Sequence, residues 1–102
     1  MDKIAQMICM AKRAGKLILG FDVVKQALQK DEAELILIAS DVSPKTEKEI
    51  MFFLEKFDGD FLKVDITLDE FWFLIGKRVG VIAVTDQGFS DKIKTLVTSH
   101  TN

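Results

Sequence analysis

Four short segments of strand length, three of them apolar and one with alternating apolar residues, are separated by amphipathic segments, and this order limits the fold more than any other feature. The amphipathic segments repeat apolar residues at helical spacing. The expected strands are residues 17–19, 35–39, 61–66 and 81–85, and the expected helices are residues 3–14, 22–30, 44–57, 68–75 and 89–97. The wholly apolar run 35–39 belongs at the centre of a sheet. We expect an α/β fold, namely a single-domain three-layer α-β-α sandwich around a four-stranded mixed sheet with helices on both faces.

Residues that favour helix ends sharpen these boundaries. Gly15 supplies the left-handed residue that commonly ends a helix. Ser43 can accept hydrogen bonds from free amides at a helix start, and Pro44 fits the first helical position, where no donor is lost. Thr67 and Glu70 have the spacing of a capping box, in which each side chain accepts a hydrogen bond from the other residue's amide. The first, third and fourth helices therefore carry recognisable end signals.

The size and composition of the chain describe a folded domain. It has 102 residues, the length of one domain, and its 48% of hydrophobic residues can fill a core. We expect residues 1–102 to form one domain, with residues 98–102 frayed. No apolar run approaches the roughly 20 residues that span a bilayer, so no membrane partner is expected. The charged N-terminus lacks the apolar centre of a secretion signal, which predicts a cytoplasmic location.

Side chains for catalysis or metal binding are scarce. Cys9 is the single cysteine and His100 the single histidine, which excludes an intrachain disulfide and a tetrahedral zinc site. His100 lies near the C-terminus, where nothing is expected to orient it as a catalytic base. Cys9 has apolar neighbours at helical spacing, which favours a small core residue over a reactive thiol. Because no glycine-rich nucleotide loop is present either, we expect neither an enzyme nor a cofactor.

Charge is divided unequally along the chain. The net charge is −2, but residues 1–30 hold six basic and two acidic side chains, and the other 72 hold eight basic and fourteen acidic ones. A solvated helix face would explain the basic residues of segment 1–30. Such an uneven charge distribution can also direct an anionic partner to one edge of the molecule. Lys12, Arg13 and Lys16 lie at the end of the first helix, and Gly20 directly precedes the second. We predict an anion site at the start of the second helix, because its first amides are free, its dipole is positive at that end, and the preceding glycine permits close approach.

A second basic loop, residues 76–80, precedes the last expected strand and holds Lys77, Arg78 and the apolar Val79 between two glycines. Apolar loop residues can support splayed bases in folded RNA, and Asp22 in the first loop could accept hydrogen bonds from a guanine edge. The alternative for each loop is a tight turn with solvated lysines, and for the first of the two glycines a helix C-cap. If one compact RNA motif contacts both loops, they must lie at the same edge of the molecule.

Several stretches together resemble one known family. They are Ala11–Leu17 (AKRAGKL) with Gly20, Leu35–Ser43 (LILIASDVS) with Thr46, Ile75–Lys77 (IGK) and Val84–Phe89 (VTDQGF). The chain is similar, from about residue 3 to residue 97, to the bacterial YlxQ-type branch of the ribosomal L-seven-Ae and L-thirty-e superfamily. The resemblance implies a three-layer α-β-α sandwich, in agreement with the order of elements. It also implies non-catalytic binding of structured RNA at kink-turns, which contain tandem sheared G·A pairs, in association with the ribosome or translation.

In that family the loop before the second helix and the loop before the last strand grip the RNA. Together with the charge pattern, the resemblance assigns RNA contact to Lys12, Arg13, Lys16, Gly20, Phe21, Asp22, Lys25, Gln26, Gly76, Lys77, Arg78 and Val79. Gly20 matches the family's glycine that lets the RNA backbone come close. Asp22 matches a position that is asparagine in archaeal and eukaryotic members. Val23 replaces a glutamate that accepts from guanine, and Gln26 replaces a lysine. The second loop is one residue shorter than in bacterial relatives, with Gly80 where a larger residue is expected.

A protein-interaction module on the same scaffold is the alternative function. Aromatic residues crowd the third and fourth expected helices, namely Phe52, Phe53, Phe71, Trp72 and Phe73. One buried face does not need so many aromatic side chains. Some are therefore expected either to reach sideways into a neighbouring element or to form an exposed patch for a protein partner.

Overall fold

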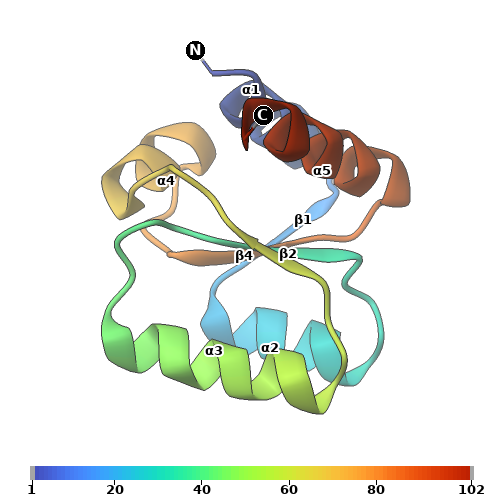
Figure 1. Cartoon of the computed structure of the whole chain (residues 1–102), viewed down its shortest axis with the longest axis vertical. Helices are drawn as coiled ribbons and strands as arrows, with labels where there is room; N and C mark the ends of the chain where they lie inside the picture. Colours follow the sequence, from blue (N-terminus) through green and yellow to red (C-terminus); the bar gives the residue numbers. More distant parts are fainter. Residues whose placement is uncertain (1, 102) are drawn as a thin grey trace.

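The computed structural model describes residues 2–101, with side chains through residue 98. Within that range, helices and strands alternate as the sequence predicts (Figure 1). The elements are α1 (Lys3–Arg13), β1 (Leu17–Leu19), α2 (Phe21–Gln29), β2 (Leu35–Ile38), α3 (Pro44–Lys56), β3 (Phe61–Lys63), α4 (Leu68–Ile75), β4 (Val81–Val84) and α5 (Gln87–Thr101). Both ends of the described chain lie on the same side of the sheet (Figure 1).

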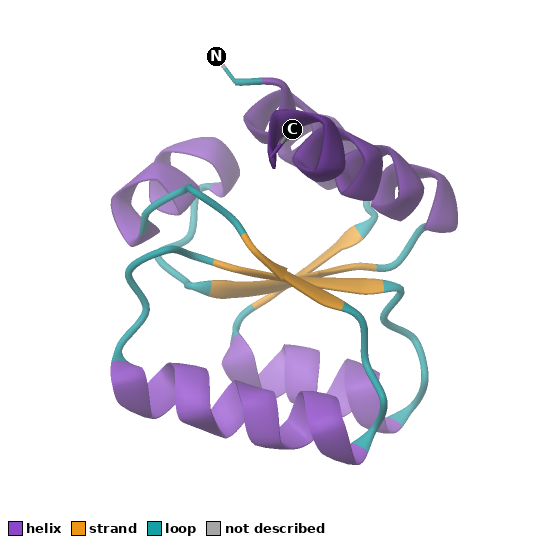
Figure 2. Cartoon of the chain, viewed as in Figure 1, coloured by secondary structure: helices purple, strands orange, loops and turns teal. Residues whose placement is uncertain are grey.

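The strands of the described chain form one mixed sheet in the order β1-β4-β2-β3 (Figure 2). β4 runs antiparallel to both of its neighbours and pairs Ile82 with Leu19 of β1 and Leu37 of β2. β3 runs parallel to β2, with Phe61 opposite Ile36. The central strands β2 and β4 are buried along their whole length, which explains their continuous apolar sequences. β1 is half-buried because it forms an edge of the sheet.

Helices cover both faces of the sheet. α2 and α3 lie on one face, and α1, α4 and α5 lie on the other (Figure 1). On the first face, Val24 and Ile50 pack in one core cluster with Ile36 of β2. On the second face, Ile8 and Phe71 pack in another cluster with Leu37, the next residue of the same strand. Alternate residues of β2 thus serve opposite cores, and the α/β three-layer sandwich expected from the sequence is confirmed.

The predicted helix-end signals form as expected. Gly15 follows α1 with φ +72°, a conformation that glycine adopts at little cost. Ser43 Oγ accepts a hydrogen bond from the Thr46 amide at 3.1 Å at the start of α3. Thr67 Oγ1 accepts from the Glu70 amide at 3.1 Å, and Glu70 Oε1 accepts from the Thr67 amide at 3.0 Å, which completes the capping box of α4. These local bonds fix where the loops around the sheet begin and end.

The last helix is longer than the sequence indicates. The Asp86 carboxylate accepts a hydrogen bond from the Phe89 amide at 2.9 Å, so α5 begins at Gln87 and not after Gly88. At its other end α5 continues to Thr101, and the fraying expected for residues 98–102 stays a prediction. Residue 102 lies outside the described residues.

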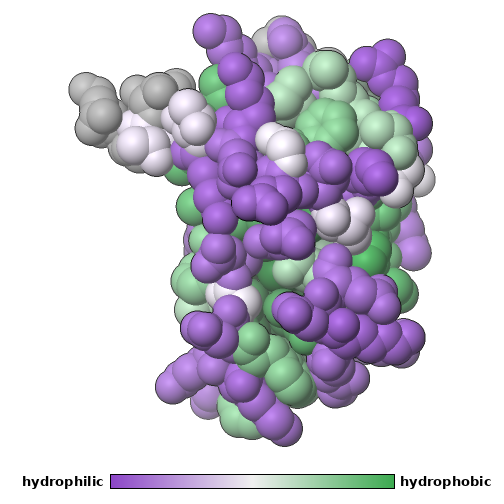
Figure 3. All heavy atoms as spheres, turned by 90° about the vertical axis from the view of Figure 1, so that its right-hand side faces the viewer, coloured by the Kyte–Doolittle hydropathy of each residue, from purple (hydrophilic) through white to green (hydrophobic). Residues whose placement is uncertain are grey.

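One side of the molecule, on the right in Figure 1, carries mostly hydrophilic side chains across its middle (Figure 3). Lys94 of α5 donates a hydrogen bond from Nζ to Asp60 Oδ2 at 2.8 Å, and this bond raises the pKa of Lys94. The hydrogen bond links α5 to the residue that precedes β3.

Among the described residues, no helix is both long enough and apolar enough to cross a membrane.

Candidate nucleic-acid interface

The two glycine loops that the sequence singles out lie side by side. Gly20 caps α2, and residues 76–80, the α4–β4 loop, lead into the neighbouring strand. A β-carbon placed on Gly20 would lie 3.8 Å from Val79 Cγ1 and 4.0 Å from Lys77 Nζ. The Gly20 amide also donates a hydrogen bond to the Val81 carbonyl at 3.0 Å. The expected common edge for these loops is therefore present in the fold.

Gly20 has a backbone conformation that other residues rarely adopt. Its φ is 109° and its ψ is 150°, in a region that is essentially restricted to glycine. No side chain caps the amides of the first turn of α2, so these donors remain directed outward at the positive end of the helix dipole. The lack of a side chain at Gly20 leaves open the space between that turn and the α4–β4 loop. A phosphate or a base could approach the backbone closely at this point.

Lys12 completes a basic group at this edge. A β-carbon placed on Gly76 would lie 3.9 Å from Lys12 Nζ, so the end of α1 reaches the α4–β4 loop. Gly76 has φ +74°, and its amide donates to the Trp72 carbonyl at 2.8 Å. It is therefore a helix C-cap, the structural role that the sequence left open for it. The same turn brings Lys77 next to Gly20, one residue along the chain from the position that Lys12 approaches.

Three other predicted contact residues are not brought into contact with the two glycine loops by any bond that the structure shows. The Lys16 carbonyl accepts from the Thr85 amide at 3.0 Å, which places Lys16 at the end of β1 opposite Gly20. The length of β1 therefore separates the backbone of Lys16 from the two loops, and contact of its side chain with RNA stays a prediction. Lys25 Nζ lies 4.7 Å from the centroid of the Phe53 ring, over α3. Arg13 is exposed at the last residue of α1.

The first turns of α2 divide into a packing side and an open side. Phe21 is half-buried, and its ring meets that of Phe53 edge to face with centroids 6.3 Å apart. Asp22 and Gln26 are exposed, one helical turn apart. Val23, with 47% of its surface exposed, is an apolar residue in an open position of the same turn. Phe21 thus positions the helix, while the exposed residues beside it are free to face a ligand.

Gly80 is explained by its neighbours. A β-carbon at this position would collide with Val42 Cγ1 and would lie 2.8 Å from Leu68 Cδ2. The larger residue expected at this position does not fit, because the side chains of Val42 and Leu68 fill the space. The sequence carries no local signal for this, since the three residues come from separate segments.

Cys9 is half-buried and lies on the side of α1 that faces α4. Its Sγ donates a weak hydrogen bond to the Leu74 carbonyl at 3.7 Å. This placement agrees with a packing role, although the residue is less buried than the sequence suggests.

No group of three or more potential metal ligands occurs in the part of the chain that the structure describes. The side chain of His100 lies outside the described side chains.

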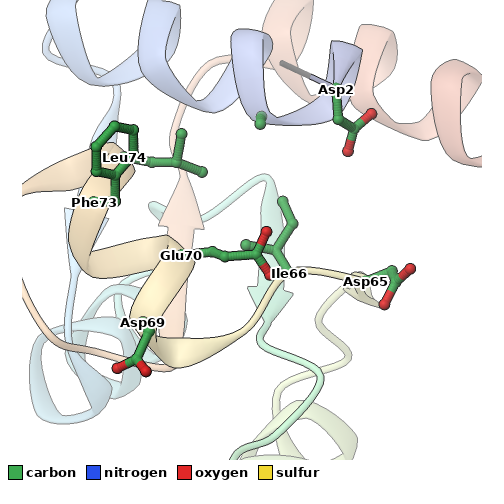
Figure 4. Close-up of a pocket in the computed structure, with 8 residues that line it drawn as sticks. Asp2, Asp65, Ile66, Asp69, Glu70, Phe73 and Leu74 are labelled. Carbon is green, nitrogen blue, oxygen red and sulfur yellow. The ribbon is translucent and has the colours of Figure 1, made fainter.

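An acidic and apolar pocket lies between α1 and α4, and one of its carboxylates, Asp69, pairs with Arg78 of the α4–β4 loop. It has a volume of about 730 Å³ and is lined by Phe73 and Leu74 together with four carboxylates (Figure 4). The carboxylates are Asp2, Asp65, Asp69 and Glu70. Sequence analysis misses this pocket because its acids come from the α1 cap, the loop after β3 and the start of α4. The charge here would repel a phosphate backbone.

The aromatic residues of α3 and α4 are divided between core and surface. Phe71 is fully buried and Phe53 is half-buried, so these two pack inward or sideways. Phe52, Trp72 and Phe73 are exposed. Because α3 and α4 cover opposite faces of the sheet, the exposed rings do not form one patch (Figure 1).

Residues 2–67, more than half of the chain, match the model of the ribosomal protein L7Ae/L30e/S12e/Gadd45 family. The chain belongs to this family. Its relatives include the RNA-binding protein YlxQ of Bacillus subtilis, which is 29% identical over 96 residues, covering 89% of this chain and 91% of that protein. Another is the large ribosomal subunit protein eL30 of Eremothecium gossypii, 32% identical over 99 residues, covering 93% of this chain and 92% of that protein.

The fold of the chain is also similar to that of a solved bacterial structure. A protein of unknown function from Bacillus halodurans superimposes with a TM-score of 0.87 at 28% identity, over 96% of this chain and 99% of that one. The YlxQ-type assignment made from the sequence motifs is confirmed. The matched family segment includes Gly20 and the first turn of α2, whereas the α4–β4 loop lies beyond it.

Proposed function

We propose that this chain binds structured RNA without catalysis, through Gly20, the first turn of α2 and the α4–β4 loop. The observation that carries the proposal is the contact between the two loops, with Lys77 and Val79 directed toward Gly20. Membership of a family whose relatives are named as RNA-binding and ribosomal proteins supports it. The preferred RNA is a kink-turn-like motif, and we infer a role in the cytoplasm on ribosomal RNA or another RNA of translation.

Each part of the interface has a distinct chemical task. Lys12 and Lys77 supply positive charge for phosphates, and the uncapped amides of α2 donate to an anionic oxygen. Val79 presents an apolar surface against which a splayed base can rest. Asp22 is exposed and can accept hydrogen bonds from a guanine edge. Backbone contacts thus position the RNA, while a small number of side chains discriminate among bases.

The first prediction concerns the salt dependence of binding. Lys77→Ala should weaken binding to kink-turn and duplex RNA alike and lower the slope of log affinity against log salt by up to about 0.9, because one phosphate contact is lost. Lys16→Ala should change the slope less, since Lys16 lies at the far end of β1. Fluorescence anisotropy of a labelled RNA, titrated with each variant at several salt concentrations, measures the affinity and its salt dependence. Lys30→Ala, at the opposite end of α2, is the matched control and should leave the slope unchanged. A larger effect from Lys16 or Lys30 than from Lys77 would contradict this interface.

The second prediction concerns base discrimination. Val23→Glu should raise the preference for a kink-turn over a matched duplex by roughly five- to a hundredfold, since one good base contact is worth about 1–3 kcal/mol. The position tolerates the change, because Val23 is largely exposed in the first turn of α2. The ratio of the two dissociation constants is the measurement. Val23→Gln, which matches glutamate in size but lacks its charge, should raise the ratio less. An unchanged ratio for Val23→Glu would show that the position does not face a guanine.

Binding of a basic protein segment is the second candidate function, and the pocket between α1 and α4 favours it. Phe73 is 84% exposed beside four carboxylates, a surface that suits an apolar anchor flanked by lysine or arginine. None of the residues that line this pocket is among the proposed RNA contacts, so binding of such a segment does not depend on RNA binding. If no RNA binds at low salt, the interaction module replaces RNA binding as the proposed function.

A further inference from the structure

Trp72 lies on the surface immediately beside the α4–β4 loop. It belongs to the second turn of α4, and 54% of its surface is exposed. The guanidinium carbon of Arg78 lies 5.9 Å from the centroid of the Trp72 ring. Together with Asp69 and Phe73, these two side chains line an open hollow of about 620 Å³.

The α4–β4 loop connects this hollow to the proposed RNA interface. Successive residues of the loop face opposite ways, because Lys77 and Val79 lie against Gly20 while Arg78 lies over Trp72. The hollow is therefore bordered by the loop that we propose to hold the RNA, one residue along the chain from Lys77 and Val79. The sequence analysis groups Arg78 with Lys77 as one basic site, but the structure assigns the two residues to different sides of the loop.

We propose that an unpaired nucleobase of the bound RNA, adjacent to the segment held by the two loops, stacks on the indole of Trp72. The inference rests on the proposed RNA-binding function and adds a second contact point to it. An exposed aromatic ring beside a guanidinium is the arrangement that proteins use to hold single-stranded bases, and every base has a face that can stack. The site therefore selects an unpaired flanking nucleotide more strongly than it selects a base identity.

The ion pair beside the ring fits a base better than a protein partner. Arg78 Nη1 lies 2.6 Å from Asp69 Oδ1, so Arg78 neutralises the carboxylate nearest to the hollow. That pair lowers the repulsion that Asp69 would otherwise exert on RNA. The remaining carboxylate oxygen can accept a hydrogen bond from an exocyclic amino group of a base. Phe73, the other ring of the hollow, also faces the acidic pocket between α1 and α4, where a phosphate is disfavoured.

Trp72 is the single tryptophan of the chain, so its fluorescence reports on this site alone. The full chain is titrated with a kink-turn RNA that carries one unpaired nucleotide next to the motif, and with the same RNA in which that nucleotide is paired. Anisotropy of the labelled RNA measures binding in parallel. Only the RNA with the unpaired nucleotide should quench Trp72, and it should bind more tightly. Trp72→Ala should weaken its binding roughly five- to a hundredfold, whereas the paired RNA should bind as before.

Two further variants complete the test. Trp72→Phe should retain most of the affinity, since a phenyl ring still stacks. Phe52→Ala is the matched control, because Phe52 is an exposed ring on α3, outside the hollow, and this variant should bind both RNAs as the unaltered chain does. If both RNAs bind but neither quenches Trp72, or if Trp72→Ala binds normally, the stacking site is overturned while the proposed function stands. Equal losses for Phe52→Ala and Trp72→Ala would indicate a general apolar surface and would also overturn it. If neither RNA binds, both proposals fail together.

Discussion

Gly20→Trp should abolish RNA binding and leave the fold intact. The indole would occupy the space between the first turn of α2 and the side chains of Lys77 and Val79, where the RNA backbone must approach. The backbone conformation of Gly20, with φ 109°, adds strain of about 1–3 kcal/mol for any other residue. A domain stable by about 5–15 kcal/mol remains folded with that loss. Anisotropy measures the binding, and circular dichroism during heating measures the fold.

Gly20→Ala separates strain from bulk. A β-carbon at this position makes only ordinary contacts, the nearest at 3.8 Å to Val79 Cγ1, so alanine introduces the strain without filling the space. Its melting temperature should fall about as far as that of Gly20→Trp, while its RNA affinity falls much less. If both variants bind RNA as tightly as the unaltered chain, the space beside Gly20 is not the binding site.

The fold could be predicted almost completely because its signals are local. The capping box of Thr67 and Glu70 requires only a spacing of three residues, and it fixes the start of α4 in the structure as it does in the sequence. The wholly apolar run of β2 indicates burial on both faces, and the structure places that strand between β4 and β3. The edge position of β1 depends on which strands pair, so its half-exposure could not be predicted from three apolar residues.

The candidate site could be predicted only in part, because side-chain direction depends on partners from other elements. Gly20 and Lys77 were found from loop composition, and the fold brings them together. Lys25 lies instead over Phe53 of α3, and Arg78 pairs with Asp69 of α4. The partner residues lie many positions away along the chain, so no spacing rule indicates them. Charge counts along the sequence therefore identified the basic segments but not the direction of each side chain.

The same limit applies to the acidic pocket between α1 and α4. Asp2 and Asp65 are 63 positions apart in the sequence but line one cavity with Phe73 (Figure 4). The overall excess of acid after residue 30 is visible in the composition, but its concentration around this pocket is not. The tertiary arrangement turns a weak asymmetry along the chain into two surfaces of opposite character. A protein with this division can contact RNA through one surface and present the other to a different partner.

Phe71→Ala should cost about 3–5 kcal/mol of the free energy of unfolding, the largest loss of stability that we expect from a single truncation in this chain. The Phe71 side chain is fully buried, with 0% of its surface exposed, and packs in the core cluster between α1, α4, α5 and the sheet. Removing the ring leaves a cavity that the surrounding helices cannot close completely, because α4 is held at its start by the capping box and at its end by Gly76. Urea denaturation followed by circular dichroism gives the change from the shift in midpoint at constant slope.

Phe73→Ala is the matched control, since it removes the same side chain two residues along the same helix. Phe73 is 84% exposed, so its loss should change the free energy of unfolding by no more than about 0.5 kcal/mol. The contrast tests the orientation of α4, on which both the Trp72 site and the acidic pocket depend. A helix rotated by half a turn would expose Phe71, bury Phe73 and reverse the order of the two losses. The orientation of α4 is therefore correct only if Phe71→Ala is much the more damaging of the two.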